Sequence, residues 1–284
     1  MHRYFKRLLS KPSAVISFAI LVILILGAVA APLIAYQDPY DLAVIDIMSS
    51  RLPPGTPSVD GYIHWMGTDD QGRDLFSAVV YGLRVSLMVA TIATSIALVV
   101  GVLVALVAAH FGGIVDAFLM RLVDLQLAFP SILTALVLVA LLGSGLDKVI
   151  FAIILAQWAY FARTLRSAAM VERTKEYIDA ARVMRFSNLR IMFKHLLPNS
   201  VAPLAVVVVV EIAAAIALEA TLSFLGVGLP ITEPSLGLLI ANGYSYMLAQ
   251  QYWLSLFPGL VLLLLLLSIN LLGERMRQIN SSKG

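Results

Sequence analysis

The strongest constraint on this chain is a set of long segments that contain no charged residue. A helix needs about 20 residues to cross the hydrocarbon core of a membrane, and it satisfies its own backbone hydrogen bonds there. Four charge-free runs meet that length: residues 14–36, 85–109, 125–146 and 254–272. The sequence therefore predicts a membrane protein rather than a soluble one.

Two further segments are less regular candidates. Residues 149–162 form a short apolar run that ends at Arg163, whose long side chain can extend to a membrane face, as can that of Arg166. Residues 196–229 are long enough to span but contain two glutamates. Counting both segments predicts an all-α, polytopic membrane protein with six transmembrane helices. Residues 236–250 are short and contain glycine and asparagine, so we expect a surface or re-entrant helix there.

The composition agrees with this class. Hydrophobic residues make up 60% of the 284 residues and charged residues 13%, whereas soluble domains are about half apolar and a quarter charged. The basic N-terminus resembles the start of a signal peptide, but residues 14–36 are too long for its apolar core, so we predict a retained first helix. We expect residues 1–80 to hold this helix and an external loop, and residues 81–284 to form the core transmembrane domain.

Lys and Arg residues indicate the orientation, because they concentrate in cytoplasmic loops. With six helices and a cytoplasmic N-terminus, 16 of the 20 Lys and Arg residues fall on the cytoplasmic side, and those outside are Arg51, Arg73, Arg84 and Lys148. Both termini and residues 163–199 are then predicted to be cytoplasmic, and residues 37–74 external. This bias explains the net charge of +3, so we expect no nucleic acid as a partner.

The predicted external loop carries three acidic residues close together, Asp69, Asp70 and Asp74. A calcium loop would need further oxygen ligands at set spacings, which are missing here. Four prolines in residues 37–74 favour a turn-rich loop, in which these carboxylates cap turns and a helix. We predict no metal and no cofactor, and the absence of cysteine excludes thiolate sites.

The predicted cytoplasmic segment has helical spacing. Ile178, Ala181 and Arg182 share one face, and Ser187 is a candidate N-cap before a second apolar stretch. Such a segment can lie on the membrane surface or bind a cytoplasmic partner.

A motif narrows this choice. Residues 176–182 read Glu-Tyr-Ile-Asp-Ala-Ala-Arg and residues 197–199 read Leu-Pro-Asn, which resembles the EAA signature of ABC importer permeases. In that family the segment forms the coupling helix, which inserts into a groove of an ATPase subunit. The resemblance implies that the coupling segment spans residues 172–199 and that its coupling residues are Glu176, Asp179, Ala180, Ala181, Arg182, Arg185, Leu197 and Pro198.

Five other stretches resemble blocks of the dipeptide, oligopeptide and nickel permeases, in the same order. They are residues 66–74 (Met-Gly-Thr-Asp-Asp-Gln-Gly-Arg-Asp), 111–113, 128–131, 222–226 and 257–260. The resemblance implies the type I permease fold of ABC importers and a bacterial inner-membrane location. The first span with its long outer loop is similar to the C-type subunit of that group.

Partners and substrate follow from the same resemblance. It implies a second homologous permease, two cytoplasmic ABC ATPases and an extracytoplasmic substrate-binding protein, all assembled in membrane lipid. The solute stays open among peptides, nickel chelates, glutathione-like molecules and sugar conjugates. Gly143-Ser144-Gly145 lacks the Gly-Lys-Ser/Thr ending of a phosphate loop, so we do not expect this chain to be an enzyme.

The sequence departs from the family pattern at two positions. Asp179 replaces the commoner Glu and keeps its charge, whereas Arg185 stands where glycine is usual. A left-handed backbone at that position costs a non-glycine residue about 1 kcal/mol. The small Ala180 and Ala181 are expected to let a partner approach closely, so Ala181→Glu should uncouple transport and leave the chain folded.

Glu211 and Glu219 lie inside the predicted span 196–229, where ionisable groups are costly. Their separation places them about 80° apart around a helix, so both can face the bundle interior. Two roles stay open, lining the pathway or pairing with a neighbouring helix. An ion-gradient-driven secondary transporter is the alternative function, but it predicts inverted repeats that the chain lacks.

Overall fold

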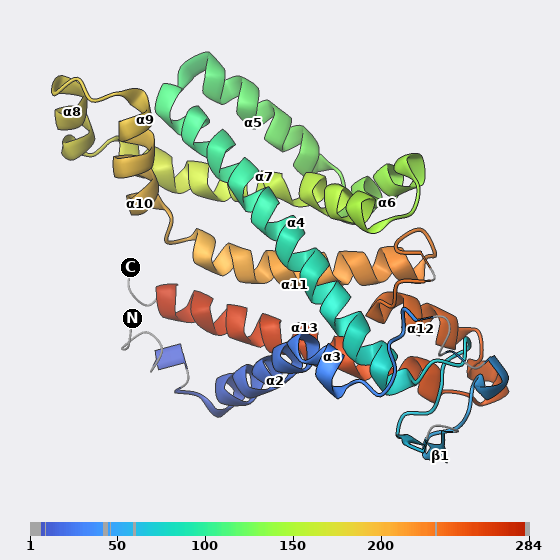
Figure 1. Cartoon of the computed structure of the whole chain (residues 1–284). Coiled ribbons are helices and arrows are strands. Elements are labelled where there is room, and N and C mark those ends of the chain that lie inside the picture. The colour runs from blue at the N-terminus through green and yellow to red at the C-terminus, as the bar shows by residue number, and fades with distance from the viewer. Residues whose placement is uncertain are drawn as a thin grey trace.

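The computed structural model describes residues 7–8, 10–41, 45, 47–58, 61–230 and 232–281, and helices dominate it (Figure 1). Five of these helices are long and apolar enough to cross a membrane. They are α2 (Pro12–Val29), α4 (Leu75–Phe111), α7 (Leu146–Arg173), α11 (Leu204–Phe224) and α13 (Trp253–Ser281). The predicted all-α membrane architecture is confirmed.

Two shorter helices together account for a sixth crossing. α5 (Gly113–Ala128) and α6 (Ser131–Leu142) are bent by 88° at a short break. Because proline lacks an N–H and forces the preceding residue out of the helical region, Phe129 is extended before Pro130, with φ −97° and ψ 138°. The prediction of one continuous helix over residues 125–146 is therefore wrong, although the bent pair keeps the number of crossings at up to 6.

α7 continues to Arg173, well beyond the predicted end at residue 162. The structure pairs Arg163 with Asp124 and Arg166 with Asp116, both acidic residues being on α5. The arginines are therefore neutralised between two helices instead of extending to a membrane face. Because Asp116 and Asp124 are charged, a search for charge-free runs does not find α5.

Other boundaries shift for local reasons. α4 begins at Leu75 rather than residue 85, because the Asp74 side chain caps its first turn. A short α3 (Ala31–Ile34) completes the first predicted run, and the predicted run 196–229 divides into α10 (Leu197–Ser200) and α11. Residues 236–250 form α12 (Leu236–Tyr244) and the turn η3 (Met247–Ala249), which is the short, non-spanning helix that the sequence predicts.

α4 is the central helix and contacts α2, α5, α7, α11, α12 and α13. It approaches α7 closely at Gly101, where an added side-chain carbon would lie 2.6 Å from Phe161 Cβ. Ala93 and Ala97 of α4 are also fully buried. Small residues let membrane helices pack closely where water supplies no hydrophobic driving force between them.

The two ends of the bundle carry different elements (Figure 1). One end holds the start of α2 and the end of α13 with α8 (Glu176–Val183), α9 (Asn188–Arg190), the π-helix η2 (Ile191–Leu196) and α10. The opposite end holds η1 (Ile47–Ser49), α12 and the antiparallel strands β1 (Thr56–Pro57) and β2 (Ile63–His64). A first helix that starts and a last helix that finishes at the same end agree with an even number of crossings. Arg3, Lys6 and Lys283, which the charge count assigns to that end, lie outside the described residues.

Candidate functional site

The predicted coupling segment begins with a well-terminated helix, α8. The Phe186 N–H donates to the Ala181 carbonyl at 3.1 Å. The Arg185 N–H donates to the Arg182 carbonyl at 2.9 Å. These two bonds form a Schellman motif, which needs a left-handed residue directly after the helix. Arg185 occupies that position with φ of 55°, so the conformation that makes a non-glycine residue costly is present there.

The segment has an apolar core of its own. Ile178 and Ala181 of α8 pack with Ile191 of η2, and Phe186 covers them. The guanidinium of Arg190 lies 3.8 Å from the centre of the Phe186 ring, a cation–π contact on this core. The segment is therefore a small folded unit rather than an isolated helix.

The two alanines of the motif point in opposite directions. Ala181 is 1% exposed and belongs to the core, whereas Ala180 is exposed. An acidic side chain at Ala181 would be buried, so the structure leads us to expect that Ala181→Glu unfolds this segment rather than leaving it folded. Val183 and Met184 are 83% and 59% exposed. We refer to Ala180, Val183 and Met184 as the α8 tip.

A polar clamp ties α8 to α7. The Glu172 carboxylate, near the end of α7, accepts a hydrogen bond from the Tyr177 hydroxyl at 2.7 Å and forms an ion pair with the Lys175 ammonium at 2.8 Å. Burial and the hydrogen bond to this carboxylate raise the pKa of Tyr177 to about 12. No role for Glu172 is predicted from the sequence. The sequence signal for such a role is an acidic residue at a helix end that is followed within five residues by a lysine and a tyrosine.

The other predicted coupling residues are placed as follows. Glu176 and Asp179 are exposed in the first turn of α8, where negative charge stabilises a helix. Asp179 forms an exposed ion pair with Arg182 at 2.8 Å. Leu197 packs partly buried against α4 and α7, and Pro198 is exposed at the start of α10.

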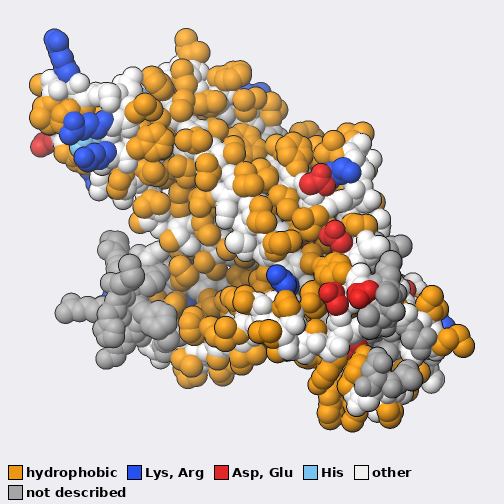
Figure 2. All heavy atoms as spheres, in the orientation of Figure 1, with side chains coloured by type: hydrophobic (Ala, Val, Ile, Leu, Met, Phe, Trp, Pro, Cys, Tyr) orange, Lys and Arg blue, Asp and Glu red, His pale blue; other side chains and the backbone are white. Residues whose placement is uncertain are grey.

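Basic side chains surround the α8 tip. Arg182, Arg185, Arg190 and Lys194 are all exposed. Figure 2 shows Lys and Arg gathered at the end of the molecule where α8 and α9 lie. α9 begins after Ser187, whose hydroxyl accepts the Arg190 N–H at 3.4 Å, and this confirms the predicted N-cap.

Glu219 lies fully buried in α11. One carboxylate oxygen accepts the hydroxyl of Ser86 on α4 at 2.7 Å, and the other accepts that of Ser223 one turn further along α11 at 2.8 Å. Ser235, the N-cap residue of α12, lies beside this carboxylate. Glu219 thus joins α4, α11 and the start of α12.

Glu211 is buried as well, but its carboxylate has no hydrogen-bond or ion-pair partner among the described residues. Its backbone carbonyl accepts the side-chain amide of Gln157 on α7 at 2.7 Å, and the Gln157 carbonyl accepts the hydroxyl of Thr94 on α4 at 3.2 Å. Both glutamates face the bundle, as their spacing predicts. Neither Gln157 nor Thr94 is predicted from the sequence, where the signal for both is a polar residue inside an apolar helix.

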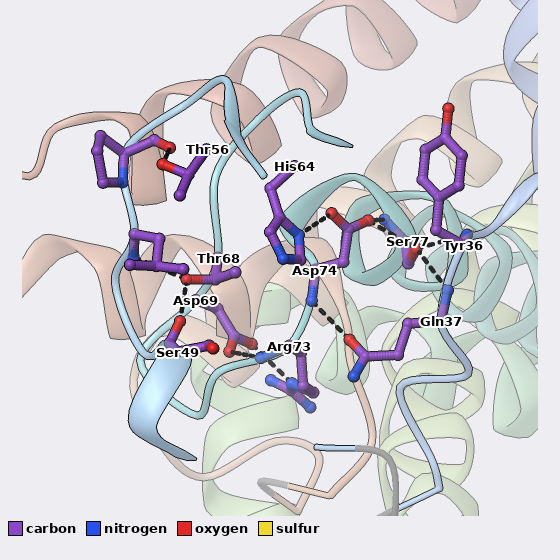
Figure 3. A network of polar contacts seen from close by, with 12 residues as sticks. Tyr36, Gln37, Ser49, Thr56, His64, Thr68, Asp69, Arg73, Asp74 and Ser77 are labelled. Atoms are coloured by element: carbon purple, nitrogen blue, oxygen red, sulfur yellow. Dashed lines mark hydrogen bonds and ion pairs between the residues drawn. The ribbon is translucent and has the colours of Figure 1, made fainter. Parts of the chain in front are cut away.

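At the opposite end, Asp74 organises a buried polar network (Figure 3). One carboxylate oxygen lies 2.8 Å from His64 Nδ1, and the other accepts the backbone N–H and the hydroxyl of Ser77 at 2.8 and 2.7 Å. The Asp74 N–H donates to the side-chain carbonyl of Gln37 at 2.7 Å. The network therefore fastens β2 and the chain after α3 to the start of α4.

Asp69 and Asp70 belong to the turn before this network. Asp69 forms a buried ion pair with Arg73 at 2.6 Å and accepts the backbone N–H of Gln71 and of Arg73 at 2.9 Å. Burial and the neighbouring Asp69 raise the pKa of Asp70. The acidic residues form a turn and a helix cap, as predicted. In the part of the chain that the structure describes, no three His, Cys, Asp or Glu residues are grouped to hold a metal.

Two family models match this chain. Residues 97–283 match the binding-protein-dependent transport system inner membrane component. Residues 1–54 match the N-terminal TM domain of oligopeptide transport permease C.

Named relatives cover nearly the whole chain. A putative peptide transport system permease protein of Brucella suis biovar 1 is 38% identical, over 96% of this chain and 89% of the relative. The dipeptide transport system permease protein DppC of Alkalihalophilus pseudofirmus is 36% identical, over 96% and 86% respectively. The probable D,D-dipeptide transport system permease protein DdpC of Escherichia coli K12 is 34% identical, over 96% and 88%.

Two solved structures share the fold at low sequence identity. A chain of the MetNI methionine ABC transporter, in inward-facing conformations, matches with a TM-score of 0.56 and 19% identity, over 72% of this chain and 97% of that one. A chain of an amino acid ABC transporter matches with a TM-score of 0.52 and 15% identity, over 72% and 94%. Since a family model covers residues 97–283 and relatives of 34% to 38% identity span 96% of the chain, the protein belongs to the inner membrane components of binding-protein-dependent transport systems, the permeases of ABC importers.

Proposed function

We propose that this chain is the peptide-importing permease subunit of a bacterial inner-membrane transporter and that residues 172–199 couple it to an ATPase. The α8 tip carries this proposal, because Val183 and Met184 present apolar surface to solvent at the end of a folded unit. Exposed apolar surface with a polar rim is typical of a protein interaction site. The basic rim of Arg182 and Arg185 suits a groove with acidic residues at its edge.

The contacts of the segment support transmission of force. Glu172 holds α8 to the end of α7, and α7 packs along α4 through Gly101. A movement imposed on the α8 tip would therefore pass to α7 and α4 as a rigid unit. Closure of two ATPases would draw two such segments together and switch the pathway between inward and outward access.

The assembly that we propose contains a second homologous permease, two cytoplasmic ATPases and an extracytoplasmic binding protein. The relatives are named for peptides, dipeptides and di- or tripeptides, which favours peptides over nickel chelates, glutathione-like molecules and sugar conjugates. Uptake of labelled di- and tripeptides by the reconstituted complex tests this choice. Uptake of a nickel chelate with no uptake of peptide would overturn it.

Both termini and residues 172–199 are cytoplasmic in this proposal, and residues 38–74 are external. The chain has no cysteine, so single cysteines report the orientation without background. Met48 in η1 and Val183 are both strongly exposed. A membrane-impermeant thiol reagent should label Met48→Cys from outside and Val183→Cys only after the membrane is opened. The reverse pattern would contradict the orientation.

We assign the two buried glutamates different roles. Glu219 accepts the hydroxyls of Ser86 on α4 and of Ser223 on its own helix, which favours a structural role. Glu211 has no side-chain partner among the described residues, which favours contact with the pathway or with the second permease. Glu219→Leu should reduce assembly of the complex, whereas Glu211→Gln should leave assembly intact and change the transport rate. The opposite pair of results would exchange the two roles.

The central experiment targets the α8 tip. Val183→Glu places a charge at the proposed apolar contact, so we expect loss of ATPase association and of peptide uptake with normal amounts of permease in the membrane. The matched control is Ile114→Glu, because Ile114 at the start of α5 is equally exposed but lies outside the segment. Normal association in Val183→Glu, or equal loss in both variants, would refute the coupling assignment.

A further inference from the structure

Arg84 is a cation on the exposed side of α4 with no partner in the described part of the chain. It is exposed, and no described carboxylate forms an ion pair with its guanidinium. It stands immediately before the charge-free residues 85–109, so its guanidinium lies at the edge of the hydrocarbon region. An unpaired arginine at that depth needs an anion or water, because charge is costly further inside.

An apolar groove of about 430 Å³ runs from Arg84 between α4 and α2. Its α4 wall is formed by residues such as Met88 and Ile92, which follow Arg84 on the same helix face. Its α2 wall is formed by Ile25 and Val29. The groove therefore combines a long apolar floor with one positive charge at its end.

The surroundings of the groove favour lipid as its occupant. α2 exposes aliphatic side chains, among them Ile23, Leu26 and Val29, as a helix facing lipid does. The volume suits a small molecule or an alkyl chain. Tyr40 and Tyr81 lie within range of the charges of both Arg84 and Asp38, and tyrosines concentrate at the level of lipid headgroups.

We propose that this groove binds one anionic phospholipid from the leaflet next to residues 37–74. The phosphate lies against the Arg84 guanidinium, whose planar fork matches phosphate oxygens. An acyl chain lies in the groove along Met88 and Ile92 and covers the joint between α2 and α4. This site is independent of the coupling role proposed for α8.

Lipid binding to the intact transporter complex tests the proposal. Phosphatidylglycerol is titrated against a phosphatidylcholine background, and bound lipid is counted by native mass spectrometry. The parent complex should hold one phosphatidylglycerol that phosphatidylcholine does not replace. Arg84→Gln should weaken this binding at least tenfold, and Arg84→Lys should weaken it less. The headgroup control is Lys148→Gln, because Lys148 is a half-buried cation that already donates to the Ser144 carbonyl at 3.1 Å.

A second pair of variants separates the groove from the charge. Ile92→Trp should fill the groove and release the lipid with Arg84 unchanged. Val99→Trp is the control, because Val99 is an exposed α4 residue that lines a different groove. The proposal is overturned if phosphatidylglycerol and phosphatidylcholine bind equally well, or if Arg84→Gln binds phosphatidylglycerol within twofold of the parent. It is also overturned if Met88→Cys cross-links fully to the second permease, because a protein would then cover the groove.

Discussion

The two ends of the bundle use charged residues in opposite ways. At the end with β1 and β2, His64, Arg73 and Asp74 are buried and paired within the chain. At the end with α8, charged side chains such as Asp179 and Arg182 face solvent, and the segment depends on a few apolar residues and the Glu172 clamp. The buried, paired side chains of the first end fix its structure. The second end keeps its own small core and leaves its surface open to the partner that we propose.

The two ends should also differ in how much free energy a charged residue contributes to folding. Removing one partner of a buried charge pair costs about 3–5 kcal/mol, because the other partner stays buried and unpaired. An exposed pair contributes about 0–1 kcal/mol, because water and salt screen it. Acidic residues that look alike in the sequence should therefore respond very differently to substitution.

The largest effect is expected for Asp74→Ala. The change removes a helix cap and leaves the buried His64 and Ser77 without their partner, so the free energy of unfolding should fall by about 3–5 kcal/mol. Thermal unfolding of the detergent-solubilised complex measures it. The matched control, Asp179→Ala, should change the free energy by less than about 1 kcal/mol. Equal losses in the two variants would remove the contrast between the ends.

The next effect compares the two neighbouring alanines of α8. Ala181→Glu buries an unpaired charge in the core of the segment, so residues 176–196 should lose local stability by about 3 kcal/mol. Ala180→Glu puts the same group on the surface, so the segment should stay folded and lose only its partner. Hydrogen exchange of the segment and ATPase association together measure both results. Protected amides in Ala181→Glu would show that the segment core is assigned incorrectly.

A smaller effect concerns the clamp. Tyr177→Phe removes the half-exposed hydrogen bond to Glu172, so α8 should open more easily by about 1 kcal/mol. The raised pKa of Tyr177, about 12, also gives a pH dependence. Because the folded value exceeds that of the unfolded chain, this contribution is present below about pH 10 and is lost as the pH rises towards 12. The absorbance titration of the parent minus that of Tyr177→Phe should leave one late transition, which belongs to Tyr177. A normal titration of Tyr177 would argue against the clamp.

The smallest effect is a stabilisation. Arg185→Gly should raise the local stability of α8 by about 1 kcal/mol, because glycine adopts the left-handed conformation without strain. Arg185→Ala keeps a side chain at this φ and removes the charge, so it serves as the control and should not stabilise. Exchange of the Phe186 amide, which closes the Schellman motif, reports the difference. If Arg185→Ala also raises the local stability of α8, the cost at this position comes from the charge of Arg185 rather than from its backbone conformation.

The sequence predicts the crossings well where hydrophobicity alone decides them, as in α2, α4 and α13. It fails at α5 and α7, because Asp116 and Arg166 neutralise each other only after the helices meet. The sequence also predicts the Ser187 cap and the strained left-handed backbone at Arg185, which depend on local backbone geometry. These features need no knowledge of distant contacts.

The sequence does not predict which face of α8 is exposed. Small Ala180 and Ala181 look equivalent, and only packing against Ile191, ten residues after Ala181, separates them. The partners of Glu219 are equally hidden, since Ser86 is 133 residues away along the chain. Long-range pairing of polar groups in apolar helices is therefore the part of the candidate site that requires the structure.

The most direct test of the account is a cross-linking measurement on the α8 tip. A single cysteine replaces Met184, and a short thiol- and amine-reactive cross-linker is applied to the assembled transporter in membranes, with Met48→Cys as the control at the opposite end. We predict that Met184→Cys captures an ATPase subunit, with a yield that changes between ATP-bound and nucleotide-free states, and that Met48→Cys captures none. An ATPase captured from Met48→Cys, or none from Met184→Cys in a complex that still transports peptide, would contradict the account.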